Sequence, residues 1–198
     1  MKHAFKELLQ ALVIGAVVFL SVQVGIKNAM VEGSSMEPTL MDSERMLVNK
    51  LVYLRVDMQR FSSLIPFWQV EEQEYRYLFH SPGQGDVVIL RYEKANPDKD
   101  LVKRVVAVPG QAIEVRHGVV YVDGDPLDEP YVPAKAASRD SMAPLTLGPD
   151  QYFVMGDNRA ASYDSRSWGP LPAESIIGKA WVIYWPFSKM NVLETPEH

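Results

Sequence analysis

Hydrophobic residues follow two different patterns along the chain. Residues 8–26 form an uncharged, mostly apolar run of nineteen positions. Beyond it, short apolar or alternating runs end at glycine, proline or aspartate, which is typical of short β-strands. This pattern predicts strands at residues 45–50, 86–92, 101–108, 112–116, 119–122, 151–155 and 176–185. We therefore expect one long helix followed by a mainly β domain.

The apolar run at 8–26 has the length of a single membrane crossing. At about 1.5 Å per residue, such a helix spans about 28 Å, close to the roughly 30 Å of the hydrocarbon core. A cleaved signal peptide is the alternative, but the run exceeds a usual signal-peptide core and no Ala-x-Ala pattern follows it. Two lysines precede the run and one follows it, which favours a cytoplasmic tail at residues 1–7. We expect a single-pass protein of the cell membrane with residues 27–198 on its outer face.

Two segments of the predicted β domain lack strand-like alternation. Residues 133–150 are rich in alanine, serine and proline, and this composition predicts a mobile loop. Residues 55–80 form an insertion rich in aromatic and apolar side chains, which predicts contact with the bilayer near the active site. A small core folded under the insertion is the alternative. The apolar residues concerned are Phe61, Leu64, Ile65, Phe67 and Trp68.

Composition excludes several functional classes. The 198 residues allow one domain with an appendage, and the net charge of −5 without a long basic run makes nucleic acid a poor partner. The chain has no cysteine, which excludes thiol nucleophiles, disulfides and zinc bound by sulfur. Two of the four histidines lie at the chain ends, and His80 and His117 lie in predicted turns or loops. We therefore expect no metal and no cofactor.

Serine and lysine are the remaining candidates for chemistry. The segment at residues 33–37, Gly-Ser-Ser-Met-Glu, lacks the second glycine of the nucleophile elbow of α/β-hydrolases. A lysine activates a serine only if burial or nearby cations lower its pKa from about 10.4 toward 7–8. Lys103 lies in an alternating run that points Leu101, Lys103 and Val105 to the same side of a strand. The pattern alone equally allows a lysine whose amine reaches solvent, so both interpretations stay open.

Three segments together carry a family resemblance. They are Gly-Ser-Ser-Met-Glu-Pro-Thr-Leu at 33–40, Lys-Arg-Val-Val-Ala-Val-Pro-Gly at 103–110, and Gly-Asp-Asn-Arg-Ala-Ala-Ser-Tyr-Asp-Ser-Arg at 156–166. In this order they resemble the bacterial type I signal peptidases, with further support from segments 42–49 and 85–88. The resemblance implies a catalytic core of antiparallel β-sheets behind a membrane anchor.

The resemblance assigns a role to each matching residue. Ser35 would be the nucleophile, Lys103 its general base, and Ser162 the residue whose hydroxyl orients the lysine amine. The Ser35 N–H would donate to the oxyanion. Gly33 stands where many relatives place a serine whose hydroxyl adds a second donor, so main-chain groups and water would supply any further hydrogen bond. The other members of the nucleophile motif are Met36 and Pro38.

The resemblance also implies two structural ion pairs and a peptide-binding surface. Arg104 would pair with Asp157, and Asp164 with Arg166, bracing the site; exposed salt bridges are the alternative. An extended substrate would place small side chains in two shallow pockets. The pocket candidates, each of which would also suit a β core, are Val31, Leu40, Met46, Leu101 and Val102.

The implied activity is removal of N-terminal signal peptides from exported preproteins. Cleavage would follow Ala-x-Ala sites, and the enzyme would be a monomeric serine endopeptidase in contact with the lipid bilayer. Only nine residues run from Lys27 to Ser35, which places the active site at the membrane surface. Two alternatives stay open: a specialised Ser/Lys processing peptidase of the same clan, and a non-catalytic membrane-anchored binding module.

Overall fold

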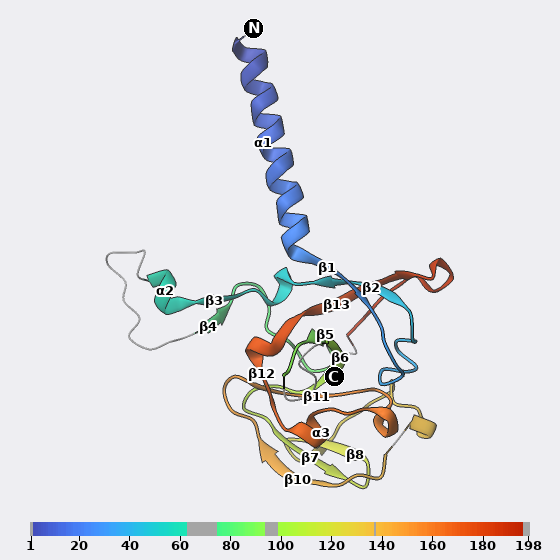
Figure 1. Ribbon diagram of the computed structural model, residues 1–198. Helices are drawn as coiled ribbons and strands as arrows, with labels where there is room; N and C mark the ends of the chain where they lie inside the picture. Colours follow the sequence, from blue (N-terminus) through green and yellow to red (C-terminus); the bar gives the residue numbers. More distant parts are fainter. Residues whose placement is uncertain (1, 63–74, 94–98, 137, 196–198) are drawn as a thin grey trace.

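A single long helix projects from a β-rich body in the computed structural model, which describes residues 2–62, 75–93, 99–136 and 138–195 (Figure 1). The helix, α1 (Lys2–Gly25), contains nearly all of the predicted apolar run and leads directly into β1 (Ile26–Met30). Within the part of the chain that the structure describes, no helix meets the length and apolarity needed to cross a membrane.

The largest sheet has the strand order β1-β2-β13-β5-β6-β11-β12, with β14 paired to β13. All of its pairings are antiparallel, so the predicted mainly β fold with antiparallel sheets is confirmed. Its other strands are β2 (Arg45–Asn49), β5 (Val87–Leu90), β6 (Leu101–Ala107), β11 (Gln151–Met155), β12 (Leu171–Pro172), β13 (Ile176–Trp185) and β14 (Asn191–Val192).

Two smaller sheets complete the described fold. One has the order β10-β7-β8-β9 and lies below the main sheet in Figure 1; the other is the pair β3-β4. Their strands are β3 (Arg55–Asp57), β4 (Tyr75–Tyr77), β7 (Ala112–Arg116), β8 (Val119–Val122), β9 (Asp125–Pro126) and β10 (Met142–Thr146). The short helices are α2 (Met58–Ser62), α3 (Ser165–Trp168), η1 (Leu51–Tyr53), η2 (Ala134–Ala136), η3 (Arg159–Ala161), η4 (Ala173–Ser175) and η5 (Phe187–Lys189).

Each of the seven predicted strands corresponds to an observed one, with ends that differ by at most two residues. The segment predicted as a mobile loop, 133–150, contains η2 and the edge strand β10. Alternation does not reveal β10, because Pro144 interrupts it and its register with β7 shifts between Met142 and Leu145. Leu64, Ile65, Phe67 and Trp68 lie outside the described residues, so the bilayer contact of the insertion stays a prediction.

Strand β6 lies where three apolar clusters meet. Val106 and Ala107 pack in a cluster with β7 and β8, whereas Val105 packs with Val88 and neighbouring residues in a second one. Val102 contacts a third cluster beneath the β1–β2 connection. Each fully buried valine contributes about 1.5–3 kcal/mol of hydrophobic stabilisation. The strand is therefore held firmly on both faces, and Lys103 is carried into the interior with it.

Candidate active site

The loop between β1 and β2 positions Ser35. Gly33 has φ +87°, a conformation that glycine adopts without strain, and its N–H donates to Asp42 Oδ1 at 2.7 Å. Met36 and Leu40, one turn apart, are joined by a backbone hydrogen bond of 3.0 Å and are buried in the cluster under the loop. Ser35 thus lies between the glycine turn and the first of two apolar anchors, and it is left half-buried at the protein surface.

Lys103 reaches Ser35 from strand β6. Its Nζ lies 2.8 Å from Ser35 Oγ, and the residue is only 3% exposed. Burial lowers the pKa of Lys103 to about 8; Asp164 and Asp157 oppose this shift, and Arg166 adds to it. An amine with this pKa is neutral in a large fraction of molecules near pH 8, so it can accept the hydroxyl proton.

Ser162 lies beside the dyad without a hydrogen bond to Lys103. Its Oγ is buried and makes no well-formed hydrogen bond with the described residues, but it lies near enough to Asp164 to help lower the pKa of that carboxyl. A Cβ placed on Gly156 would lie 2.3 Å from Ser162 Oγ and 2.4 Å from the Ser35 carbonyl oxygen. Only a residue without a side chain fits at position 156, because the Ser162 hydroxyl and the nucleophile loop both converge on it.

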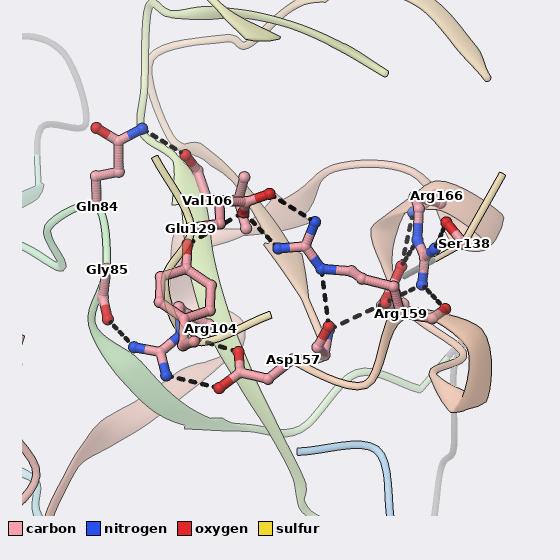
Figure 2. Close-up of polar contacts among 12 residues, drawn as sticks. Gln84, Gly85, Arg104, Val106, Glu129, Ser138, Asp157, Arg159 and Arg166 are labelled. Carbon is pink, nitrogen blue, oxygen red and sulfur yellow. Dashed lines mark hydrogen bonds and ion pairs between the residues drawn. The ribbon is translucent and has the colours of Figure 1, made fainter. Parts of the chain in front are cut away.

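Arg104 and Asp157, the first predicted ion pair, are in contact and buried. The guanidinium donates Nε to Oδ1 at 2.9 Å and Nη2 to Oδ2 at 2.6 Å. Its third nitrogen donates to the Gly85 carbonyl at 2.7 Å, as Figure 2 shows, and the ring of Tyr131 lies 3.9 Å from Cζ. Asp157 also accepts from Thr39 Oγ1 at 2.5 Å. This cluster ties β6 to the nucleophile loop and to the segment after β11.

Asp164 and Arg166, the second predicted pair, are also in contact. Arg166 donates Nε and Nη2 to the carboxylate at 2.9 and 2.8 Å, and the Gly156 N–H donates to it at 3.0 Å. Burial alone would raise the pKa of Asp164, but these hydrogen bonds lower it below its ordinary value. Arg166 also donates to Ser138 and Asp140 (Figure 2). Asp164 is 0% exposed, so the alternative of exposed salt bridges does not describe these pairs.

Asn158 and Arg159 contribute contacts that the sequence interpretation missed. The Asn158 N–H donates to the Ser35 carbonyl, and its Nδ2 donates to the Ser34 carbonyl, both at 3.1 Å. Arg159 donates to the Gly156 carbonyl at 3.0 Å and pairs with Glu129 (Figure 2). Both residues lie in the 156–166 motif, but a linear motif does not reveal which of its members face the loop 120 residues earlier.

A groove of about 600 Å³ leads from the dyad toward the end of α1. One side is β1, which pairs only with β2 among the described strands. The other side is the start of β6, where residues 101–103 pair with β5 and the pairing with β11 begins only at Arg104. Two strand edges therefore face the groove with backbone groups available to a third strand.

The groove is lined by three of the five predicted pocket residues, Val31, Leu101 and Val102. Leu40 and Met46 do not line it, since both are 0% exposed and lie in the apolar cluster beneath Val31. The strand alternation that points these side chains inward is the same for a pocket wall and for a core, so the sequence could not separate the two. Ala29 and Met36 line the groove in addition.

Comparison with known proteins matches most of the chain to one family. The family described as "Signal peptidase, peptidase S26" matches residues 4–185. A "Probable signal peptidase I-2" from Synechocystis sp. is 30% identical over 97% of this chain and 78% of its own length. "Signal peptidase I U" from Bacillus subtilis is 32% identical over 92% of this chain and 88% of its own.

A solved structure of a signal peptidase I from Enterococcus faecalis V583 is 27% identical, covers 50% of this chain and 97% of its own, and has a TM-score of 0.44. The family match spans more than half of the sequence and includes all three motif segments. This chain therefore belongs to the signal peptidase family, peptidase S26.

Proposed function

We propose that this protein is a type I signal peptidase, a serine endopeptidase that removes signal peptides from exported preproteins after Ala-x-Ala sites. The observation that carries the proposal is the contact of 2.8 Å between Lys103 Nζ and Ser35 Oγ, with the lysine almost fully buried. A lysine with a pKa of about 8 next to an accessible serine is the arrangement that an activated nucleophile requires.

The reaction proceeds in two proton-transfer cycles. Neutral Lys103 takes the Ser35 proton as Oγ bonds to the scissile carbonyl carbon, and the Ser35 N–H donates to the developing oxyanion. Lys103 then gives the proton to the leaving amine as the carbon–nitrogen bond breaks. Water attacks the ester in the second cycle, with Lys103 again as base, and Ser35 is regenerated.

Ser162 orients the lysine amine in this proposal. The Ser162 oxygen is buried and has no geometrically well-formed hydrogen bond among the described residues, so it can accept one from the Lys103 amine. The charged and the neutral Lys103 amine can both donate an N–H to the Ser162 oxygen, and in the neutral amine this bond leaves the lone pair free. A hydrogen bond to Ser162 then holds the lone pair toward Ser35.

The substrate lies in the groove as an extended strand between β1 and β6. Hydrogen bonds to the two free strand edges hold its backbone, and alternate side chains point into the apolar wall at Ala29, Val31 and Val102. The wall is backed by the buried Leu40 and Met46, which leave little depth for a large side chain. This arrangement suits small residues at alternate substrate positions.

Helix α1 is the membrane anchor in this proposal, with residues 1–7 in the cytoplasm and the catalytic domain on the outer face. The nineteen uncharged residues 8–26 and the exposed apolar side chains along α1 support this role. Both β1 and β6 run from the α1 end toward the dyad. A peptide whose apolar segment stays in the bilayer thus enters the groove from α1. One chain supplies both members of the dyad, which supports an enzyme that acts as a monomer.

Replacement of either member of the dyad is expected to abolish cleavage. Ser35→Ala and Lys103→Ala should each lower kcat/KM on a preprotein by about 10⁴-fold or more, because attack needs both the nucleophile and its base. Lys103→Arg should fail equally, since arginine stays protonated. Ser34→Ala, on the neighbouring exposed serine, is the matched control and should cleave normally. A Lys103→Arg enzyme that keeps a tenth of wild-type activity would contradict the mechanism.

The pH dependence of kcat/KM is expected to report the Lys103 pKa. The active form is the neutral amine, so activity should rise with pH through about 8 and fall roughly tenfold per unit below that value. The measurement is kcat/KM on a preprotein between mild acid and alkaline pH. A His80→Ala, His117→Ala double variant should keep the same profile, and loss of the rising limb in that variant would assign it to a histidine instead.

Ser162→Ala is expected to give activity between wild type and Ser35→Ala. If the hydroxyl orients the neutral amine, its removal should lower kcat and move the pH limb, while KM changes little. Ser162→Thr, which keeps a hydroxyl, should recover part of the loss. A fall in activity with an unchanged pH profile, and without recovery by threonine, would mean that Ser162 only fills space beside Gly156.

A further inference from the structure

Asn158 holds two consecutive carbonyl groups of the nucleophile loop. Its side-chain Nδ2 donates to the Ser34 carbonyl, and its backbone N–H donates to the Ser35 carbonyl, both at 3.1 Å. We propose that Asn158 is a positioning residue that aims the Ser35 N–H at the oxyanion of the reaction. This inference rests on the proposed function and concerns how strongly the enzyme stabilises the transition state.

The peptide group between Ser34 and Ser35 transmits the effect of the Asn158 side chain. This peptide bond is trans. In a planar trans peptide the C=O and the N–H point in opposite directions. A bond from Asn158 that fixes the direction of the Ser34 carbonyl therefore also fixes the direction of the Ser35 N–H.

The two ends of this peptide group face different sides of the loop. Ser35 lines the groove of about 600 Å³ beside the dyad. Asn158 does not line that groove and instead lies with Glu37 and Pro38 around a separate hollow of about 180 Å³. The Ser35 N–H points away from Asn158 and donates to none of the described residues. It is therefore available to an oxygen of a peptide in the groove.

Few other contacts restrain this peptide group. Gly33, just before it, has φ +87° and open space where a Cβ would lie, and Ser34 is exposed. Packing fixes the loop from Met36 onward, which is 1% exposed. The Glu37 N–H also donates to the Ser34 carbonyl, at 3.2 Å, but it belongs to the same loop and moves with it. Among the described residues, Asn158 supplies the bond to this carbonyl from outside the loop.

Asn158 is itself held firmly on both sides. Asp157, before it, is 0% exposed and bound by Arg104, as Figure 2 shows, and Arg159, after it, is 3% exposed. The Ala161 N–H donates to the Asn158 carbonyl at 3.0 Å. The segment after β11 thus presents the side-chain amide at a fixed place beside the nucleophile loop.

The direction of the Ser35 N–H affects the rate because negative charge develops on the substrate oxygen as the carbonyl carbon becomes tetrahedral. A donor that is already aimed at this oxygen stabilises the transition state more than the bound substrate. Gly33 contributes no side-chain donor, so the alignment of the main-chain N–H matters more. Loss of the Asn158 amide should therefore lower kcat and leave KM nearly unchanged. The Lys103 pKa should also stay the same, because no charge is added or removed.

The test compares three variants of full-length enzyme with wild type. Asn158→Leu keeps the shape of the side chain and removes its donor, whereas Asn158→Gln keeps an amide. The control Gln84→Met removes another half-buried side-chain amide, which donates to the Val106 carbonyl at 2.9 Å (Figure 2). Each enzyme is assayed for kcat, KM and pH profile on a preprotein.

Two inhibitors then report on the oxyanion separately from substrate binding. One is a peptide that ends in Ala-x-Ala with an aldehyde in place of the last carboxyl group, and the other is the matching alcohol. Ser35 Oγ adds to the aldehyde carbon, its proton passes to Lys103, and the former carbonyl oxygen accepts from the Ser35 N–H. The alcohol occupies the same groove but cannot undergo this addition.

Asn158→Leu should lower kcat by about tenfold or more and weaken aldehyde binding by a similar factor. Its KM, its affinity for the alcohol and its pH limb near 8 should match wild type. Asn158→Gln should recover part of both losses, and Gln84→Met should keep wild-type values. If Asn158→Leu does not fold, Asn158→Ala is judged by the same criteria.

Wild-type kcat and aldehyde affinity in the variant without the amide would overturn the inference. An equal loss of affinity for aldehyde and alcohol, or a displaced pH limb, would also overturn it, because Asn158 would then act on the groove or on Lys103. A wild-type enzyme that cleaves no preprotein would instead refute the proposed function.

Discussion

Burial of the Lys103 amine is the constraint on which the site depends. Holding its pKa at about 8 rather than 10.5 corresponds to about 3 kcal/mol, which folding must supply from elsewhere. Strand β6 supplies it through Val105 and Val106, which pack in different apolar clusters on its two faces. The lysine cannot turn to solvent without lifting these valines out of the core. The packing of the sheet thereby keeps the Lys103 amine buried beside Ser35, where its lowered pKa allows it to act as a base.

The two ion pairs next to the dyad also help to keep the Lys103 pKa low. Asp157 and Asp164 are the two carboxylates that raise the Lys103 pKa, and either one left unpaired would favour the charged amine. Each is held by an arginine through two hydrogen bonds, Asp157 by Arg104 and Asp164 by Arg166. The same contacts fix β6 against the segment after β11. The two ion pairs therefore both hold strand β6 in place and limit how far Asp157 and Asp164 raise the Lys103 pKa.

Much of the fold could be predicted because the central strands are long and alternating. Strands β9, β12 and β14 have two residues each, too few for any periodicity to appear. The dyad and its ion pairs could be expected from motif resemblance, and the inward direction of Lys103 from alternation. The contacts of Asn158 could not, because they join segments far apart in the sequence: Asn158 and Ser34 are 124 positions apart. Leu40 and Met46 were predicted to line the pocket but are buried in the core. The sequence could not separate the two, because inward-pointing residues alternate in the same way in a core and in a pocket wall.

Direct titration of the Lys103 amine tests the central claim most closely. In full-length Ser35→Ala protein, lysines labelled with ¹³C at Cε each give an NMR resonance that shifts when the amine loses its proton. The resonance that disappears when Lys103→Met is added belongs to Lys103. The account predicts that this resonance titrates near pH 8, well below the ordinary lysine pKa of about 10.4. Titration of the Lys103 resonance near the ordinary lysine pKa of about 10.4 would show that the amine stays charged at neutral pH, and would contradict the account.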